Sequence, residues 1–184
     1  MIPDNIISIK EYAFYRCRGL SSLTLSKNLE SIEQYAFCAC NKLETLEIPN
    51  GVKKIGNRSF SRLYNLKTLT IPSSLSIMEG YPFVDDNALT SIKVDDGNEY
   101  YDSRSNCNAL IRKDGDVLIQ GCVNTVIPNG VNAIGEYSFY GCPIKSLNIP
   151  EGVKKISYSA FSLCVDLVSV NIPSSVTSII GNTF

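Results

Sequence analysis

The hydrophobic positions of this chain follow one pattern that repeats about every 23 residues. All seven phenylalanines fall at the same point of the pattern, at intervals of 23, 23, 23, 56, 22 and 23 residues. They are Phe14, Phe37, Phe60, Phe83, Phe139, Phe161 and Phe184. An apolar residue stands five positions before each of them, as Ile32 does before Phe37. This regular spacing indicates a repeat protein with one structural unit per interval.

A second pattern, apolar-x-x-apolar-x-apolar, lies between successive phenylalanines. In one unit it consists of Leu43, Leu46 and Ile48, and Pro49 follows. The last two apolar positions alternate with polar ones, as in a β-strand, and proline ends the strand because it has no N–H for the ladder. Turn residues such as Asn50-Gly51 come next. Each unit is therefore predicted to contain a strand, a turn, a short extended segment and a helical or 3₁₀ turn around the phenylalanine.

One such unit cannot fold alone. Ordering its backbone costs roughly 1–2 kcal/mol per residue, whereas its half-dozen large apolar side chains return roughly 1.5–3 kcal/mol each. The units must therefore stack, so that neighbours cover both faces of every unit. We predict a single solenoid domain over residues 1–184, with a parallel β-sheet along one side and the phenylalanines stacked as a ladder.

The 56-residue interval between Phe83 and Phe139 contains one irregular repeat, at about residues 95–127. Residues 108–111 and 117–120 resemble two short strands, and Asp114-Gly115 between them is a strong hairpin-turn signal. The added β-hairpin has two interpretations: it only completes the stack, or it protrudes and helps to bind a partner. The candidate contact residues are then Tyr100, Tyr101, Arg112, Lys113 and Asp114.

The unit from Leu43 to Phe60, L-E-T-L-E-I-P-N-G-V-K-K-I-G-N-R-S-F, resembles the leucine-rich repeats of the BspA-like, Treponema-type family. The long interval also resembles an interruption found in bacterial members. The resemblance implies an α/β-type repeat solenoid, a leucine-rich repeat right-handed superhelix with short extended and helical or 3₁₀ segments opposite the sheet. It also implies a secreted or cell-surface module of bacteria and some protists, which binds other macromolecules in adhesion or in protein or glycan recognition.

Composition narrows the classes of function. The 17 basic and 18 acidic side chains nearly cancel, so neither a nucleic-acid partner nor a polybasic membrane anchor is expected. No apolar run approaches the ~20 residues that span a bilayer, and a secretion signal is absent or already removed. The lack of histidine excludes Ser-His-Asp and Cys-His catalysis. We therefore expect a non-catalytic protein without cofactor or metal, and the alternative is an intracellular scaffold or a structural segment of a larger repeat protein.

The outward positions of the predicted strands form a ladder of small hydroxyls and amides. This candidate binding face consists of Ser22, Thr24, Thr45, Glu47, Thr68, Thr70, Ser91, Lys93, Ser146, Asn148, Ser169 and Asn171. Because it has few of the Tyr, Trp and Arg residues that dominate protein interfaces, it suggests a weak, broad or glycan-type surface, or simply an exposed sheet. Tyrosines near the phenylalanine turns, such as Tyr12, Tyr35 and Tyr137, would be better anchors where they are half exposed.

The cysteines also follow the repeat. Four of the seven, Cys17, Cys40, Cys142 and Cys164, stand three residues after a ladder phenylalanine, where another unit has a leucine. This position predicts reduced core thiols, although disulfides between adjacent units are sterically possible. Cys38 is the best candidate for an exposed thiol. No second cysteine pair accompanies Cys38 and Cys40 at metal-ligand spacing, so we expect no zinc site.

Two further features concern the acidic pairs and the chain ends. The pairs Asp85-Asp86, Asp95-Asp96 and Asp114/Asp116 have turn-like neighbours and lack EF-hand spacing, so we expect turns rather than a calcium site. The sequence starts and stops part-way through a unit, and neither end has a polar cap. We therefore expect a fragment of a longer array, or ends that a partner covers, including end-to-end self-association.

Overall fold

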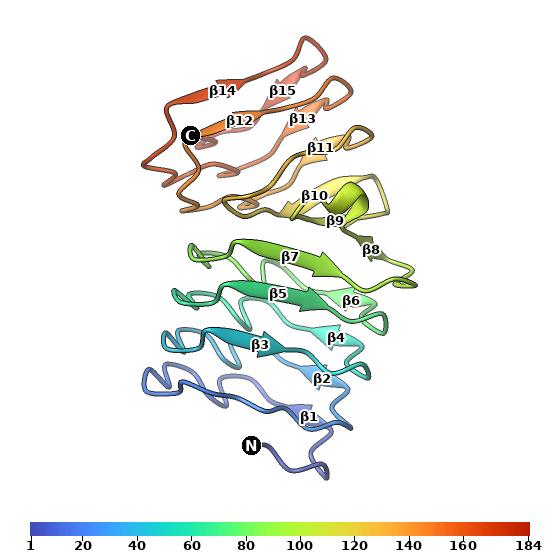
Figure 1. The fold of residues 1–184 in the computed structure, drawn as a ribbon, viewed down its shortest axis with the longest axis vertical. Helices are drawn as coiled ribbons and strands as arrows, with labels where there is room; N and C mark the ends of the chain where they lie inside the picture. The colour runs from blue at the N-terminus through green and yellow to red at the C-terminus, as the bar shows by residue number, and fades with distance from the viewer.

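The computed structural model describes residues 1–184 and shows a solenoid of stacked coils (Figure 1). It has about 7 turns of ~23 residues, which confirms the predicted repeat length and solenoid. The chain rises steadily from the N-terminal coil at one end of the stack to the C-terminal coils at the other. Each regular coil therefore contacts only the coil before it and the coil after it.

The front face carries strands of the apolar-x-x-apolar-x-apolar pattern in two separate parallel sheets. The first sheet consists of β3 (Thr45–Glu47), β5 (Thr68–Ile71) and β7 (Ser91–Val94), and the second of β12 (Ser146–Asn148) and β14 (Ser169–Asn171). Leu46 lies opposite Leu69, and Leu69 lies opposite Ile92, all three with their side chains in the core. The pattern therefore places its apolar positions inward, as predicted.

The parallel sheet predicted along this side is present but is interrupted between β7 and β12. The intervening segment, residues 122–128, contains no strand. Two of its N–H groups bond within the irregular coil instead: Cys122 N–H donates to Thr125 Oγ1 at 2.8 Å, and Val126 N–H donates to the Cys107 carbonyl at 3.0 Å. These N–H groups are not available to a neighbouring strand, so the front sheet is interrupted here.

The back face carries the short extended segments that precede the phenylalanines, again in two sheets. One sheet has the order β1 (Ser8–Ile9), β2 (Ser31–Ile32), β4 (Lys54–Ile55) and β6 (Ile77–Met78). The other has the order β15 (Ser178–Ile179), β13 (Lys155–Ile156), β11 (Ala133–Ile134), β10 (Val117–Gln120), β9 (Leu110–Arg112) and β8 (Tyr101–Asp102). Successive coils pair in parallel, whereas β10, β9 and β8 pair antiparallel.

The predicted hairpin is confirmed as β9 and β10, but it does not protrude. β10 also pairs in parallel with β11, with Val117 opposite Ala133, so the hairpin is part of the back sheet. Leu110, Ile111 and Leu118 are fully buried. These apolar side chains hold the hairpin in the stack and leave only its tip in solvent.

The turns around the ladder phenylalanines are not helical, which corrects the sequence expectation. Tyr12 and Arg16, two residues before and after Phe14, both have a φ of 58°, in the left-handed region. The Phe14 N–H donates to the Ala36 carbonyl of the next coil at 2.7 Å rather than along its own turn. A helix would need these N–H groups for itself. The helical element of the structure, the 3₁₀ helix η1 (Arg104–Asn106), lies in the irregular coil.

The phenylalanine rings form two stacks. Phe14, Phe37, Phe60 and Phe83 stack with centroid separations of 5.0, 5.4 and 5.8 Å. The second stack separates Phe139 from Phe161 by 5.3 Å and Phe161 from Phe184 by 5.4 Å. The rings inside each stack are buried and nearly parallel. Each ring therefore fills the space between two coils, as the ladder predicts.

Gly121 interrupts the ladder between the two stacks. Its N–H donates to the Ser138 carbonyl at 2.7 Å, which is the bond that a ladder phenylalanine makes in the regular coils. A Cβ on Gly121 would overlap the Phe139 ring, so no larger residue fits without displacing that ring. The buried side chains accordingly divide into two clusters, one on each side of this coil. The boundary between the two clusters, at the coil that contains Gly121, is termed the junction.

The cysteines are unpaired thiols, and six of the seven are buried. Burial raises the pKa of the Cys40 thiol to about 11 and that of Cys142 to about 12. Cys38 is also buried, which contradicts the expected exposed thiol, because Ser61 of the next coil covers it and donates a hydrogen bond to its sulfur at 3.2 Å. The exposed thiol is Cys17, in the first coil.

Replacement of a ladder ring tests the stacked core. We expect Phe60→Ala to lower the free energy of unfolding by roughly 3–5 kcal/mol, because it opens a cavity between Phe37 and Phe83. Urea unfolding followed by circular dichroism measures the loss. Phe184→Ala is the matched control, because that ring is 58% exposed in the last coil and should cost far less. A loss below ~1 kcal/mol for Phe60→Ala would contradict an interior ladder.

Alkylation tests the burial of the thiols. Under native conditions we expect iodoacetamide to modify Cys17 first, because the other six thiols are buried. Burial also raises the pKa of five of them, Cys40, Cys107, Cys122, Cys142 and Cys164. Peptide mapping by mass spectrometry over a time course measures the order. Urea should make all seven sites react at similar rates. Native modification of Cys38 as fast as that of Cys17 would show that Ser61 does not cover its sulfur.

Candidate functional site

The front face places the predicted ladder of hydroxyls and amides on the surface. Thr45, Thr68 and Ser91 lie side by side across β3, β5 and β7, and Ser91 is only half exposed. On β12 and β14, the Asn171 amide donates to Asn148 Oδ1 at 2.7 Å. Ser22 and Thr24 lie in a segment without strand assignment, outside the sheet. The face is therefore polar, flat and divided, and its role in binding stays a prediction.

One of the five hairpin candidates is not at the surface. Tyr101 is buried and cannot serve as an exposed anchor, which corrects its assignment to a protruding hairpin. Arg112, Lys113 and Asp114 are exposed at the tip. Tyr100 is 49% exposed and lies beside them, because its carbonyl accepts the Lys113 N–H at 2.9 Å. The side chain of Tyr101 packs in the interior because β8 pairs with β9 and so joins the back sheet.

Aromatic side chains gather along the turns that carry the phenylalanine ladder. This tyrosine stripe consists of Tyr12, Tyr15, Tyr35, Tyr81, Tyr137, Tyr140 and Tyr158. The rings of Tyr12 and Tyr35 stack at 5.1 Å, and Tyr81 and Tyr137 meet edge-on at 4.7 Å across the junction. The Arg16 guanidinium lies 5.0 Å from the centre of the Tyr15 ring. Tyrosine and arginine at half-exposed positions are typical of protein interfaces.

The repeat itself creates the tyrosine stripe. Tyr12, Tyr35, Arg58, Tyr81 and Tyr137 each stand two residues before a ladder phenylalanine. The phenylalanine points into the core, whereas the side chain two positions earlier stays at the surface. The sequence identified three of these residues as possible anchors but missed Tyr81 and Tyr158. The same two-residue spacing before Phe83 could have identified Tyr81, whereas Tyr158 stands three residues before Phe161 and does not follow it.

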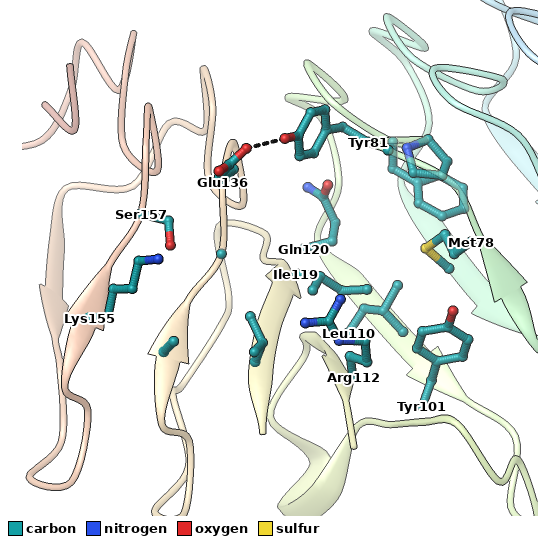
Figure 2. A pocket seen from close by; sticks show the side chains of 16 residues that line it. Met78, Tyr81, Tyr101, Leu110, Arg112, Ile119, Gln120, Glu136, Lys155 and Ser157 are labelled. Atoms are coloured by element: carbon teal, nitrogen blue, oxygen red, sulfur yellow. Dashed lines mark hydrogen bonds between the residues drawn. The ribbon is translucent and has the colours of Figure 1, made fainter. Parts of the chain in front are cut away.

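A groove of about 480 Å³ lies at the junction, on the back face (Figure 2). Its floor consists of the outward residues of β10 and β11 with their continuations, Val117, Ile119, Ala133 and Gly135. Met78, Tyr81 and Phe83 of the preceding coil form one side, and Arg112 and Lys155 also line the groove. The sequence did not predict this groove, because its residues come from four different coils.

One hydrogen bond closes the groove at its upper end in Figure 2. The Tyr81 hydroxyl donates to the Glu136 carboxylate across the junction. Burial, together with this bond, raises the pKa of Tyr81 to about 12, so the hydroxyl stays protonated. Tyr81 also belongs to the tyrosine stripe, so the groove and the stripe meet at this residue. Together, the groove and the tyrosine stripe present aromatic rings, an aliphatic floor and cationic side chains at the surface.

The acidic pairs serve the turns in which they lie. The Arg104 guanidinium is held between Asp102 and Asp116, at 2.7 and 2.8 Å. Asp85 accepts from the Tyr64 hydroxyl at 3.1 Å and lies 3.5 Å from Arg62. No group of three or more Cys, Asp or Glu side chains lies close enough to hold a metal ion.

Asp86 is a buried carboxyl at a core position. It stands three residues after Phe83, where the preceding coil has Leu63 and the next regular coil has Cys142. Asp86 Oδ1 accepts the Leu63 N–H at 2.8 Å, but Oδ2 has no hydrogen-bond partner. Burial raises the pKa of Asp86 well above its ordinary value, because water cannot stabilise the charge. Asp86 therefore opposes folding when it is ionised.

Comparison with known proteins agrees with this geometry. A family model for the BspA type leucine rich repeat region matches residues 1–110 and 120–184, in six copies. The chain belongs to the BspA-type leucine-rich repeat family. BspA-type proteins generally serve as non-catalytic binding modules for proteins or surface ligands. The unmatched residues, 111–119, fall in the hairpin of the irregular coil. No curated protein matches the sequence.

Several solved bacterial structures share this BspA-type fold. The pneumococcal vaccine antigen PcpA is 25% identical with a TM-score of 0.70, over 95% of this chain and 50% of its own. A leucine-rich repeat protein from Eubacterium ventriosum is 21% identical with a TM-score of 0.62, over 94% of this chain and 46% of its own. A leucine-rich cell surface protein from Faecalibacterium prausnitzii is 22% identical with a TM-score of 0.51, over 98% and 78%. The chain spans about half the length of the first two.

Substitution of Asp86 tests its burial. Its raised folded-state pKa means that the folded protein holds the proton more tightly than the unfolded chain does. The stabilisation is complete below the unfolded pKa of about 4 and is lost as the pH rises through the folded pKa. We expect Asp86→Asn, which keeps the acceptor for the Leu63 N–H, to stabilise the protein by roughly 1–3 kcal/mol at neutral pH.

Urea unfolding at pH 3 and pH 7 separates this effect from a general one. The gain from Asp86→Asn should appear at pH 7 and shrink at pH 3, where the native carboxyl is already neutral. Asp166→Asn, at an exposed aspartate, is the control and should change little at either pH. An equal gain at both values would mean that the charge of Asp86 is not its cause.

Proposed function

We propose that this BspA-type chain is a non-catalytic module that binds a partner protein through the tyrosine stripe. The observation that carries the proposal is the clustering of partly exposed rings along these turns: Tyr12 stacks on Tyr35, and Tyr137 contacts Tyr158 and, across the junction, Tyr81. Arg58 occupies the equivalent position between the two groups of rings. Tyr12, Tyr15 and Tyr158 are 36–49% exposed, so their rings can be desolvated by a partner. The front face offers short polar side chains, which supports a secondary, glycan-type contact there.

We also propose that the protein acts at the cell surface of a bacterium or after secretion. The Faecalibacterium prausnitzii relative is described as a cell surface protein, and PcpA as a vaccine antigen. The structure contains no helix with the length and apolar character needed to cross a membrane. Protease treatment of intact producing cells tests the location: loss of the protein supports it, and full protection contradicts it.

The unpaired cysteines favour a second candidate, an intracellular scaffold within a larger repeat protein. Six buried thiols persist most easily in a reducing compartment. Failure of the surface-protease test would favour this candidate.

Paired substitutions test the tyrosine stripe. Tyr12→Asn and Tyr137→Asn remove two rings while keeping the left-handed backbone, because Asn182 adopts a φ of 56° at the equivalent place in the last coil. Against an array of extracellular matrix proteins and glycans, we expect the double variant to bind its protein partner about 30-fold more weakly or worse, as for interface hot spots. Surface plasmon resonance on the positive proteins measures the change.

The matched control alters the front face. Thr70→Lys copies Lys93, which lies beside it in the sheet, and therefore keeps the strand intact. Thr70→Lys should leave the affinity for the protein partner unchanged. The opposite result, with Thr70→Lys abolishing binding and the tyrosine variant retaining it, would assign binding to the front face instead.

A further inference from the structure

Equivalent lysines on the back face have different surroundings. Lys54 and Lys155 each stand six residues before a ladder phenylalanine. The Lys54 ammonium lies 3.4 Å from Glu33 and 3.0 Å from Glu79, which come from the coils on either side. The surface charge of Lys54 is therefore neutralised within the protein.

Lys155 has no such partners. Glu33 and Glu79 stand four residues before their phenylalanines, and the equivalent residues on either side of Lys155 are Gly135 and Ile180. Neither can carry a charge, and Lys155 forms no ion pair. Lys155 is exposed and lines the junction groove. The groove thus retains a positive charge that the repeat neutralises elsewhere.

Arg112 supplies a second unpaired cation to the groove. Its Nε donates to the Asp114 carbonyl at 3.2 Å, and no carboxylate lies within ion-pair distance. Arg104, by contrast, forms ion pairs with both Asp102 and Asp116. Glu136 is the one carboxylate that lines the groove, and it accepts the Tyr81 hydroxyl. The net charge of the lining is therefore positive.

The rest of the groove is suited to an aliphatic body. Val117, Ile119 and Ala133 form its floor, and the backbone of Gly135 approaches the Leu118 carbonyl so closely that a Cβ there would lie 2.7 Å from its oxygen. Glycine and alanine thus keep the floor low between β10 and β13. An apolar floor beside unpaired cations is complementary to a ligand with apolar and anionic groups.

We propose that the junction groove binds an extended, acidic and aliphatic peptide segment of the partner protein. The proposal rests on the proposed function and adds the chemistry of the segment: aliphatic side chains lie on Val117 and Ile119, and separate carboxylates reach Arg112 and Lys155, which stand three strands apart in the back sheet. β6 pairs only with β4, and Met78 of β6 lines the groove. An extended peptide can hydrogen-bond along such a strand edge.

An acidic saccharide fits the groove less well. A sugar carries many hydroxyls, and each one that loses water needs a hydrogen-bond partner. The Gln120 amide already donates to the Gly121 carbonyl at 3.0 Å, and Tyr81 already bonds Glu136. The floor residues Val117, Ile119 and Ala133 have no polar side-chain atoms, although Ser157 also lines the groove. The aliphatic floor therefore favours a peptide with aliphatic side chains.

The test uses a library of short fluorescein-labelled peptides in which Leu or Val alternates with Asp or Glu. The same peptides with Asn or Gln are the matched ligands without charge. Fluorescence anisotropy with the whole chain should show a preference for the acidic peptides of about tenfold or more. Lys155→Ala and Arg112→Ala should each weaken binding about fivefold, the upper range for an exposed ion pair.

Lys54→Ala is the matched protein control, because it removes an equivalent but neutralised lysine, and it should leave peptide affinity unchanged. Circular dichroism confirms that all variants are folded. Absence of acidic preference, or equal weakening by Lys54→Ala and Lys155→Ala, overturns the proposal. Binding of oligogalacturonates in place of peptides, with loss in Lys155→Ala, also overturns it and assigns the groove to saccharides.

The two proposals fail separately. One outcome is that the tyrosine double variant loses binding to the partner found on the array while Lys155→Ala keeps it. In that case the tyrosine stripe stands and the groove proposal is overturned. If acidic peptides bind as expected but the tyrosine variants keep full affinity for the partner, the groove stands and the stripe is overturned. The peptide assay needs no knowledge of the partner, so its outcome is independent of the array.

Discussion

Hydrogen bonding between coils is the constraint on which the structure depends. At the phenylalanine turns the Phe37 N–H donates to the Ser59 carbonyl of the next coil at 2.7 Å, and on the back face the Glu33 N–H donates to the Ile9 carbonyl of the preceding coil at 2.9 Å. A coil removed from the stack would leave these groups without protein partners and would expose its ring. The coils on either side therefore determine which side chain fits at each position. A local irregularity changes only the contacts with those two coils.

The junction shows how such an irregularity is accommodated. Gly121 removes one ring from the ladder, and the front sheet stops at the same coil. The back sheet continues through β10 and β11, and the contacts of Tyr81 with Tyr137 and Glu136 connect the coils on either side. The stack thus stays continuous while its core divides in two. The space that opens on the back face is the groove.

The repeat spacing was sufficient to predict the coils and the ladder, because both depend on residues at fixed separations. The hairpin was predicted from the Asp114-Gly115 turn signal instead. The repeat spacing could not predict the conformation of the turns, since Tyr12 and Arg16 are not residue types that signal a left-handed backbone. It placed Cys38 at the surface because Ser61, which covers it, lies in the next coil. The groove was missed for the same reason: its lining depends on which residues the irregular coil brings together.

In a repeat protein, each residue can be compared with the residues at the same position of the other coils, because equivalent residues occupy equivalent surroundings in every regular coil. Three departures gather at or beside the junction: Gly121 replaces a ladder phenylalanine, Asp86 replaces a leucine or cysteine, and Lys155 lacks the carboxylates that hold Lys54. The first two weaken the stack, since one removes a buried ring and the other buries a charge. Selection for stability alone would favour the regular residues. Of the three residues only Lys155 lines the groove, so Lys155 is the departure that bears on the proposed binding, whereas Gly121 and Asp86 show where the stack is locally weakened.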